Sequence, residues 1–595
     1  MILEGMNNPL VPLLASVKRP ARYLGGEWGA YVKDDARDMV RVCLAFPDVY
    51  EVGMSYLGYQ ILYSLVKTCD YADAERVYCP WPDMEAAMRE ARLPLGSLES
   101  GRVLRDFDAV CFTLQYELCA TNMLTMLDLG GIPLESSCRD DGDPIVIGGG
   151  GGACAPAAFE IFFDAFCVGD GEELLPAVMS VLGELKGGSR AEKLGALSRV
   201  PGVYVPGVST DVTRSAVIED LDGGFIHRTM VVPNCGIVHD RVAVQVFRGC
   251  TRGCRFCQAG MTGRPRRERG ASSAEDQLDA LLGYTGWEEV GLLSLATCDW
   301  SGLNVLLSSM SAKLERDNIK ISLPSLRMDS FSVELAAGLE VMRRGGLTFA
   351  PEAGSERLRS VINKGITDDD VTSALDAAFR HGWERIKLYF MMGLPTETTS
   401  DLDGIIDIAD RAVHHARINK RRGEISVSLA GFVPKAHTPF QWEAQESRES
   451  LRERGRYVKG RVKSKKISLS YHEPDQTFLE GVFARGGREL GAAVLEAWRR
   501  GARFDGWTEC FDFGLWEGVF RDMDIDPGWY ANRTRALDET LPWDMIDVGV
   551  SKEFLASERE RALGGEPTPD CADGGCNGCG WQTRSAVCAS MPRVF

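Results

Sequence analysis

Short apolar runs alternate with amphipathic stretches between residues 41 and 225. The amphipathic stretch at residues 56–66 predicts a helix, and the apolar runs predict strands at residues 42–46, 76–79, 109–113, 145–147 and 165–168. Strands that alternate with helices predict an α/β domain with a parallel, doubly wound, flavodoxin-like sheet. We expect a ligand at the carboxyl ends of its strands. Residues 1–40 are a polar lead-in.

A second series of apolar runs begins near residue 241 and defines a domain over residues 236–460. Helical patterns such as 274–282 and 331–342 separate most of the runs, which lie at residues 243–247, 289–293, 319–323, 347–349, 386–390 and 425–429. Six β-α units predict a partial (β/α)6 barrel of the TIM type, with its chemistry at the carboxyl ends of the strands. Residues 461–565 are predicted to be mostly helical, and residues 566–595 form a cysteine-rich tail.

Composition places the chain among proteins of ordinary soluble character. Its 595 residues are 45% hydrophobic and 26% charged, without an apolar stretch of 18 residues. The amino terminus lacks a basic region followed by an apolar core, so no signal peptide is expected. Many of the 18 cysteines lie in apolar runs and indicate free thiols in a reducing cytosol. We therefore expect a cytoplasmic protein that makes no membrane contact.

The net charge of −18 opposes non-specific binding to nucleic acid. Residues 448–466 are an exception, because nine Lys or Arg stand there against two Glu. Such a segment is either the solvated face of a helix or a contact surface for RNA, a ribosomal substrate or another polyanion. Both interpretations stay open at this point.

The cysteine motif at residues 250–257 carries the clearest chemistry. Cys250, Cys254 and Cys257 are spaced C-x3-C-x2-C, and Phe256 precedes the last of them. Three thiolates can hold three irons of a [4Fe–4S] cluster and leave the fourth iron open to a small molecule. Zinc would need a fourth protein ligand, and none lies nearby in the sequence. The motif therefore predicts an iron–sulfur cluster on the loop after the first barrel strand.

Two glycine-rich loops follow strands of the first domain and are candidates for ligand binding. One is the run of five glycines at residues 148–152, and the other is Gly169-Asp-Gly-Glu. Glycines admit a close approach of a ligand to the backbone. Neither loop matches a G-x-G-x-x-G motif that leads into a helix. The candidate binding residues are Gly148, Gly149, Gly150, Gly169 and Gly171.

The cysteine motif resembles the signature of radical S-adenosylmethionine (radical SAM) enzymes. That resemblance implies that the open iron binds the amino and carboxylate groups of SAM. One electron, from a donor such as flavodoxin or ferredoxin, would then cleave SAM to methionine and a 5′-deoxyadenosyl radical.

Later turns are similar to SAM-contacting turns of the same family. Glu352 resembles the glutamate after the fourth strand, and Gly393 with Pro395 resembles the Gly-Leu-Pro turn after the fifth. The turn at residues 432–439 is similar to the one after the sixth strand. A Gly-Gly-Glu motif for the SAM amino group is missing after the second strand. There the sequence offers Ser294, Thr297 or Asp299 instead.

After the third strand, Arg327 and Asp329 face the predicted site. They form either a structural salt bridge or a contact with SAM or substrate.

The first domain resembles the cobalamin-binding domain that precedes many radical SAM barrels. Its glycine loop, Pro156, Asp164 and the Gly169 turn carry the likeness. The first histidine of the chain is His227, so this domain offers no histidine as a lower cobalt ligand. It either binds cobalamin without one or has lost cobalamin and only packs on the barrel. Residues 46–54, 349–354 and 432–435 resemble an uncharacterised subfamily of cobalamin-domain radical SAM proteins.

The tail contains a second set of closely spaced cysteines. Cys571, Cys576, Cys579 and Cys588 follow a C-x4-C-x2-C pattern, and eight residues separate the third cysteine from the fourth. The order resembles that of plant ferredoxins, although the last interval there is longer. A second iron–sulfur cluster, a structural zinc ion and a disordered tail are the three interpretations.

Three functions are consistent with these features. The first is a cobalamin-dependent radical SAM enzyme, most simply one that methylates an unactivated carbon. The second is a cobalamin-independent radical SAM enzyme that modifies RNA or the ribosome, similar to methylthiotransferases. Those carry three cluster cysteines in the first domain, where this chain has the widely separated Cys43, Cys69 and Cys79. The third is a non-catalytic iron–sulfur redox protein.

Overall fold

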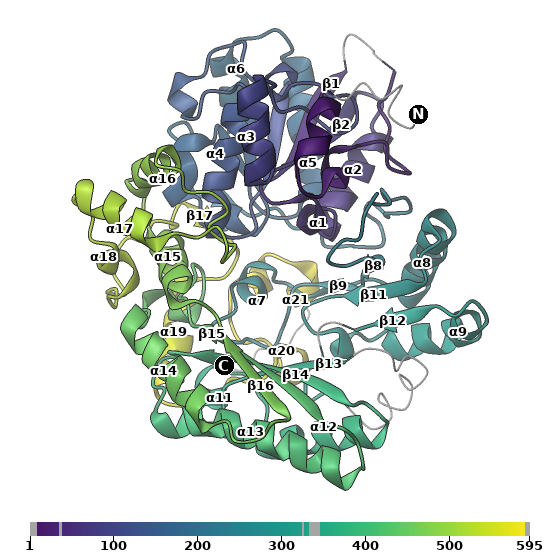
Figure 1. Cartoon of the computed structure of the whole chain (residues 1–595), viewed down its shortest axis with the longest axis vertical. Helices are drawn as coiled ribbons and strands as arrows, with labels where there is room; N and C mark the ends of the chain where they lie inside the picture. Colours follow the sequence, from purple (N-terminus) through teal and green to yellow (C-terminus); the bar gives the residue numbers. More distant parts are fainter. Residues whose placement is uncertain (1–8, 35–38, 324–325, 332–345, 590–595) are drawn as a thin grey trace.

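The structure is a computed structural model that describes residues 9–34, 39–323, 326–331 and 346–589. In Figure 1 the amino-terminal domain lies above the barrel, and the carboxyl-terminal helices run along one side of both. The carboxyl ends of the strands in both domains face the space between them, which is also where the short helix α7 (Gln258–Thr262) lies. This arrangement brings the two predicted sites toward each other.

The amino-terminal domain is a six-stranded sheet in the order β2-β1-β3-β4-β5-β6. Its first five members are parallel, and β6 is antiparallel to β5. The order 2-1-3-4-5 is that of the flavodoxin-like fold, as the alternation of strands and helices predicted. The strands are β1 (Val40–Phe46), β2 (Ala72–Tyr78), β3 (Ala109–Thr113), β4 (Ile145–Gly149), β5 (Ala165–Cys167) and β6 (Val203–Tyr204).

Helices cover both faces of this sheet. Helices α2 (Leu57–Thr68) and α5 (Gly171–Glu184) bury their apolar sides in one core, and α6 (Arg190–Leu197) lies beside α5. On the opposite face, α3 (Pro82–Ala91) and α4 (Ala120–Leu129) pack into a second core. The sheet is therefore buried on both sides, which explains its nearly continuous apolar strands.

Strand β2 begins four residues earlier than its apolar pattern indicates. It contains the charged residues Asp73, Glu75 and Arg76, and all three are buried. Ion pairs compensate for this burial: Lys67 Nζ lies 2.6 Å from Asp73, and Arg76 Nε lies 2.6 Å from a carboxylate oxygen of Glu99. A buried charge is tolerated when it is paired in this way. Such pairing cannot be read from a hydrophobic pattern.

The barrel consists of two parallel sheets joined by a bridge between Leu326 and Phe349. One sheet has the order β12-β11-β8, and the other has the order β13-β14-β15-β16. Strand β16 pairs with β15, so this sheet extends beyond residue 460, into the region expected to be helical. The strands are β8 (Val242–Gln245), β11 (Glu289–Leu293), β12 (Lys320–Ser322), β13 (Leu347–Glu352), β14 (Arg385–Met392), β15 (Glu424–Gly431) and β16 (Ile467–Tyr471).

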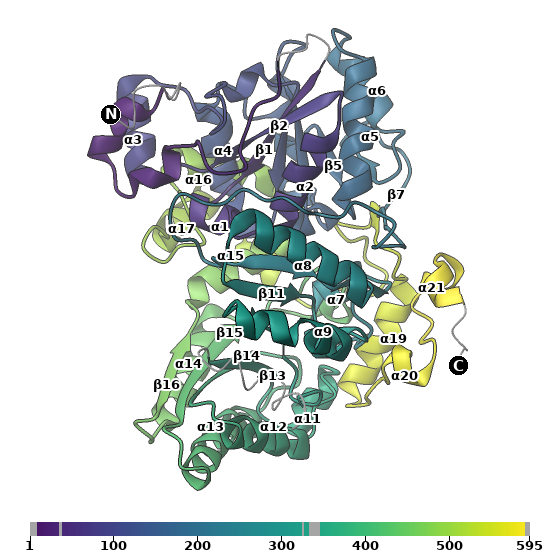
Figure 2. The same ribbon diagram turned by 90° about the vertical axis from the view of Figure 1, so that its right-hand side faces the viewer.

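Amphipathic helices cover the outer side of the barrel. Apolar residues of α12 and α13 share one core with β13, β14 and β15, and Figure 2 shows both helices along the base of that sheet. The helix expected at residues 331–342 lies almost entirely outside the described residues. The helices are α8 (Ala271–Thr285), α9 (Leu303–Arg316), α11 (Glu356–Val361), α12 (Asp368–Arg380), α13 (Thr399–Ile418) and α14 (Arg448–Arg461).

The carboxyl-terminal region packs against both domains. Helix α16 contacts α4 of the first domain, and Arg503 pairs there with Glu85 at 3.0 Å. Trp516 and Trp543 are buried and belong to the core, whereas Trp529 is exposed. The helices are α15 (Pro474–Arg485), α16 (Leu490–Arg499), α17 (Phe513–Asp522), α18 (Pro527–Ala531), α19 (Lys552–Leu563), α20 (Cys571–Gly574) and α21 (Ala586–Ala589).

The basic segment forms α14 and the loop after it. Several of its arginines pair with carboxylates of the same chain: Arg448 and Arg452 pair with Asp475, Arg454 with Glu397, and Arg461 with Asp403. Much of its positive charge is therefore balanced internally. Among the described residues, no helix has both the length and the apolar character needed to cross a membrane.

Candidate functional site

The cysteine loop starts where the first barrel strand ends. Strands β8 and β9 (Phe247–Arg248) lead into residues 249–257, and α7 follows at once. Gly249 has φ +83°, and a Cβ atom there would lie 2.4 Å from the carbonyl oxygens of Gly263 and Pro265. Only glycine fits this turn without strain. It sets the loop at the carboxyl end of the strand, as the sequence predicted.

The three thiols of this loop are half-buried neighbours. Burial, followed by the nearby Cys254, raises the pKa of Cys257 to about 12. Burial and Cys254 also raise the pKa of Cys250. Bare thiols in this place therefore resist ionisation, whereas bound iron would stabilise the thiolates. The nearby cations Arg264, Arg327 and Lys364 favour the thiolate forms and suit an anionic cluster.

The motif of these thiols suits a cluster better than a single ion. A zinc ion needs four ligands, with sulfur at about 2.3 Å, and the loop supplies three cysteines. In a cubane, each thiolate binds a different iron, and the fourth iron is left open. The loop residues therefore fit a [4Fe–4S] cluster. Within the described part of the chain, no group of three or more His, Cys, Asp or Glu side chains is arranged to hold a metal ion.

Two buried side chains hold the backbone of the cysteine loop. Arg255 is fully buried; it pairs with Glu558 at 3.0 Å and donates to the carbonyl oxygen of Val361 at 3.0 Å. Asn363 donates from its side-chain amide to the carbonyl oxygens of Arg252 and Gly253. The role of Arg255 is not evident in the sequence, because a charged residue inside a motif gives no signal of its burial.

Arg252 neutralises several acidic groups beside the loop. Its guanidinium donates to both carboxylate oxygens of Asp299, at 2.7 and 2.8 Å, and also pairs with Asp329 at 3.2 Å. Asp299 is thus occupied, which leaves Ser294 and Thr297 as the candidates for the SAM amino group. Their hydroxyl oxygens lie 2.9 Å apart.

The neighbouring pair Arg327 and Asp329 forms a salt bridge at 3.0 Å, which is the first of the two alternatives that the sequence left open.

The SAM-side turns meet Phe256 around an apolar wall. Phe256 packs against a cluster that contains Ala353, Leu394 and Phe432, which follow β13, β14 and β15. Three strand ends that are far apart in sequence are thereby brought to the aromatic residue of the cysteine motif. Ala353 stands directly after Glu352, and Leu394 stands between Gly393 and Pro395.

Polar contacts fix two of the same turns. Glu352 pairs with Lys364 at 3.3 Å. Gly393 donates its backbone N–H to the Glu397 carboxylate at 2.9 Å. Lys364 therefore links the Glu352 turn to Cys257, whose thiolate it favours.

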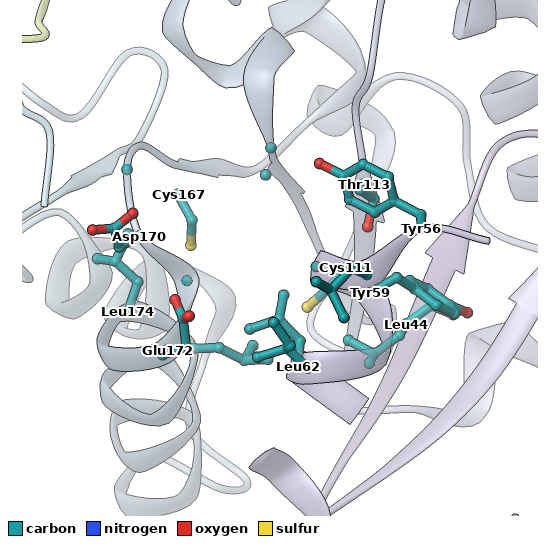
Figure 3. Close-up of a pocket in the computed structure, with 18 of the residues that line it drawn as sticks. Leu44, Tyr56, Tyr59, Leu62, Cys111, Thr113, Cys167, Asp170, Glu172 and Leu174 are labelled. Carbon is teal, nitrogen blue, oxygen red and sulfur yellow. The ribbon is translucent and has the colours of Figure 1, made fainter. Parts of the chain in front are cut away.

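A cavity of about 500 Å³ lies at the carboxyl ends of the first sheet, between the strands and helices α2 and α5. Figure 3 shows Leu62, Tyr59 and Cys111 on one side of it and the carboxylates of Asp170 and Glu172 on the other. Gln245 and Arg248 of the barrel also line it, so it opens toward the cysteine loop. Its mainly apolar wall includes Leu44, Tyr56, Leu57, Ile61, Ile147, Cys167, Leu174 and Leu175.

Four of the five predicted glycines line this cavity: Gly149, Gly150, Gly169 and Gly171. Gly148 does not. It lies within β4, paired with Phe112 and Phe166, so its position is set by the sheet.

Gly169 has a clear structural constraint as well. Its φ is +111°, and a Cβ atom there would lie 2.1 Å from the Ala216 carbonyl oxygen. The acidic side chains of the same turn dock the two domains: Arg248 pairs with Asp170 at 2.9 Å and with Glu172 at 2.7 Å. His239, near the start of the barrel domain, also lines the cavity.

A second cavity, of about 230 Å³, separates the glycine loop from the cysteine loop. Gly151 and Gly152 line it from the first domain, and Gln258 lines it from α7. Lys435 contributes the positive charge of its wall, with Glu117 and Glu480 each 2.7 Å from its ammonium nitrogen.

In the sequence, Lys435 is notable only as part of the turn at residues 432–439, which is similar to the turn after the sixth strand of radical SAM enzymes. Neither glutamate is notable in the sequence, because the two come from separate domains. Burial raises the pKa of Glu117, whereas Lys435 opposes that effect.

The tail cysteines lie together beside the central loop. Cys576 and Cys579 are buried, and Cys571 and Cys588 are half-buried. Burial raises the pKa of Cys571, and the nearby thiols of Cys579 and Cys588 raise it further. Burial also raises the pKa of Cys588, and the nearby thiols of Cys579 and Cys576 add to that effect. Asp570, next to Cys571, pairs with Arg252 of the cysteine loop at 3.2 Å.

The three amino-terminal cysteines are not gathered in this way. Cys43 and Cys79 pack into the core on one face of the first sheet, and Cys69 packs on the other.

Solved structures of two enzymes share a limited likeness with the whole chain. A radical SAM methyltransferase, TsrM from Kitasatospora setae, solved with cobalamin and a [4Fe–4S] cluster, has a TM-score of 0.47 and 14% identity. It covers 68% of this chain, which in turn covers 77% of TsrM. OxsB, a cobalamin-dependent SAM radical enzyme solved with aqua-cobalamin and SAM, has a TM-score of 0.46 and 12% identity. The coverage is 88% of this chain and 79% of OxsB.

Two archaeal proteins are related in sequence. The uncharacterised protein MJ0966 of Methanocaldococcus jannaschii is 24% identical over 493 residues, which are 80% of this chain and 98% of that protein. The uncharacterised methyltransferase PH0819 of Pyrococcus horikoshii is 26% identical over 174 residues, which are 28% of this chain and 36% of that protein.

Family models cover both large domains. Residues 58–206 match the model for the amino-terminal domain of radical SAM proteins, and residues 244–409 match the model of the radical SAM superfamily. The second match includes the cysteine loop, Glu352 and Gly393, and together the two span just over half of the chain. Enzymes of this superfamily use a [4Fe–4S] cluster and SAM. The chain belongs to the radical SAM superfamily and is a radical SAM enzyme.

Proposed function

We propose that the protein cleaves SAM reductively at a cluster held by Cys250, Cys254 and Cys257, and that it methylates or otherwise modifies a substrate with the help of cobalamin. The observation that carries this proposal is the position of two cavities beside the cysteine loop. Arg248, two residues before Cys250, lines the 500 Å³ cavity, and Gln258, directly after Cys257, lines the 230 Å³ cavity. The cluster would supply the electron that cleaves SAM to methionine and a 5′-deoxyadenosyl radical.

On the SAM side, the protein's residues would bind and orient the cofactor. The wall around Phe256 offers an apolar surface for the adenine ring, and Ser294 and Glu352 offer oxygen atoms to polar groups of SAM. Arg327 and Lys364 lie close enough to the thiols to balance the charge of a cluster with three thiolates. Gly393 and Pro395 shape the turn beside that wall.

The larger cavity supports cobalamin. It enters the first domain between the sheet and helices α2 and α5, with glycines at its mouth and apolar side chains along its wall. A slot of this kind suits the nucleotide base of a corrinoid, and the glycines let a large ring approach the backbone. These residues fit the group, and a domain that had only a packing role would not need an open cavity of 500 Å³ at its strand ends.

We place the substrate in the smaller cavity. It lies between the glycine loop and α7, so a bound molecule would face both predicted cofactor sites. Glu117 and Glu480 outnumber Lys435 there, so the cavity favours a neutral or cationic group. These half-buried carboxylates can also accept a proton from the substrate.

The partners follow from the chemistry of the site. A one-electron carrier such as flavodoxin or ferredoxin would reduce the cluster, in the reducing cytosol where free thiols persist. The RNA or ribosomal contact at residues 448–466 stays a prediction. The ion pairs of Arg448, Arg452, Arg454 and Arg461 lower the charge available to a polyanion.

Anaerobic turnover tests the proposal. The reconstituted protein is incubated with SAM, dithionite and hydroxocobalamin, and 5′-deoxyadenosine and S-adenosylhomocysteine are measured by mass spectrometry. We expect both products, and we expect Cys254→Ala to abolish 5′-deoxyadenosine. The matched control is Cys138→Ala, an exposed cysteine far along the chain from the site, which should behave like the wild type.

The outcomes separate the two enzymatic candidates. Full 5′-deoxyadenosine formation by Cys254→Ala would overturn the assignment of the cluster. If 5′-deoxyadenosine forms without corrinoid binding in the micromolar range, the cobalamin-independent modification of RNA or the ribosome takes its place. S-Adenosylhomocysteine together with bound corrinoid supports methylation.

A further inference from the structure

The tail docks directly on the cysteine loop. Besides the pair between Asp570 and Arg252, the backbone N–H of Thr568 donates to Asn363 Oδ1 at 2.8 Å. Arg255 donates to the Glu566 carbonyl oxygen at 2.7 Å and to the Thr568 hydroxyl at 3.1 Å. In Figure 2 the yellow helices α19, α20 and α21 lie together along one side of the barrel. The four tail cysteines are therefore held against the radical SAM site by buried contacts.

Arg264 occupies the place where the tail and the loop meet. It follows α7, is 4% exposed and stacks its guanidinium over the Phe554 ring at 5.4 Å. None of its three guanidinium nitrogens makes a hydrogen bond of normal geometry among the described residues. The titratable groups that act on it are cysteines: Cys571 and Cys579 of the tail and Cys250 of the loop, with the Cys579 thiol within reach of the guanidinium. A buried, unpaired guanidinium is costly, so this position calls for an anion that the bare chain does not supply.

We propose that the four tail cysteines ligate a second [4Fe–4S] cluster, and that buried Arg264 donates N–H hydrogen bonds to its sulfur atoms. A cubane with four thiolates carries a net negative charge, which is the partner that Arg264 lacks. Hydrogen bonds to cluster sulfurs and a nearby positive charge both stabilise such a site. The inference does not depend on the reaction proposed above.

The cysteine spacing favours a cluster over zinc. A zinc site would bring all four sulfurs to about 2.3 Å from one ion. A cubane binds each of the four tail thiolates to a different iron, so its ligand sulfurs need not meet at one ion. Their spacing, C-x4-C-x2-C followed by a more distant cysteine, is also an order used by iron–sulfur proteins.

Metal analysis of the full-length protein tests the proposal. After anaerobic reconstitution with iron and sulfide, the wild type should bind about eight irons and eight sulfides per chain, as expected for two [4Fe–4S] clusters. The double variant Cys576→Ser and Cys579→Ser should lose half of each, and its remaining cluster should still respond to SAM. Cys138→Ser, the matched control, should lose none. Unchanged iron, or the loss of one zinc ion in place of iron, would overturn the proposal.

A second measurement does not require the double variant to fold. Mössbauer and electron paramagnetic resonance spectra of the reduced wild type should contain two cluster signals, of which SAM perturbs only one. A single signal, wholly perturbed by SAM, would contradict a second cluster.

The role of Arg264 is tested separately. Arg264→Met should lower the midpoint potential of the SAM-insensitive cluster, because a nearby positive charge stabilises the more negative, reduced form. Arg264→Lys keeps the positive charge and should bring the midpoint potential of that cluster most of the way back to the wild-type value. Equal potentials in all three proteins would refute the hydrogen-bonding role.

Point variants serve better here than removal of residues 566–595. That deletion would also take away Thr568 and Asp570, which hold the central loop.

Discussion

Glu558 on α19 is expected to stabilise the cysteine loop from a distance in sequence of about three hundred residues. Its carboxylate pairs with Arg255 Nε at 3.0 Å and accepts the Thr568 hydroxyl at 2.7 Å. Arg255 is fully buried between Cys254 and Phe256. Glu558→Gln keeps the shape of the side chain and removes its charge, so it isolates the electrostatic part of this contact.

The magnitude follows from what Arg255 retains. Removal of one partner of a buried ion pair costs about 3–5 kcal/mol when the other charge is left uncompensated. Here Arg255 keeps three carbonyl acceptors, those of Ser360, Val361 and Glu566. A hydrogen bond to a charged group is worth about 1.5–3 kcal/mol, so we expect a loss of about 2–3 kcal/mol. That free energy corresponds to about a 30- to 150-fold increase in the open population of the loop.

Hydrogen exchange at residues 249–260 and the iron content after reconstitution measure this effect. Amide exchange in the loop should accelerate by the same factor, and less iron should be retained under mild chelation. Asp317→Asn, which removes an exposed pair with Arg316 on the outer surface, is the control and should change neither. If Glu558→Gln exchanges and binds iron like the wild type, the ion pair does not hold the loop, and the reasoning fails.

Two further variants probe other parts of the protein. Leu62→Trp fills the larger cavity and should weaken corrinoid binding at least about tenfold, measured by absorbance titration, while SAM cleavage persists. Val305→Trp on the exposed side of α9 is its control, and equal affinities would place the corrinoid elsewhere. Burial raises the pKa of Glu397 to about 7, although the hydrogen bond from Gly393 and the ion pair with Arg454 both act to lower it. The folded protein then holds a proton that the unfolded chain releases near pH 4.3, so stability should fall by about 3 kcal/mol as pH rises to about 7. Denaturant unfolding of Glu397→Gln should lack this slope, and an equal slope would contradict the assignment.

Much of the fold is evident in local patterns. Most strands of the two sheets were predicted within a few residues, and those of the first domain are apolar along their length because the sheet is buried on both faces. The short β6 and the polar β16 were missed, and β2 was predicted too short, because its charged residues Asp73 and Arg76 are paired with Lys67 and Glu99. Ion pairs between separate segments leave no trace in a local pattern.

The sequence by itself determined the kind of chemistry. Cys250, Cys254 and Cys257 lie within eight residues, so their spacing alone indicates an open cluster. The glycine loops and the tail cysteines are equally local, and each could be named without coordinates. Local motifs report what a segment can bind, because their ligands are neighbours along the chain.

Only the tertiary structure decided which of these segments meet. It brings Glu117, Lys435 and Glu480 from three regions into one cavity, and it lays the tail on the cysteine loop with Arg264 between them. It also shows that Gly148 serves the sheet and that Asp299 is held by Arg252. Contacts of this kind depend on the packing of whole domains, and a linear sequence does not record which distant residues will share a buried space.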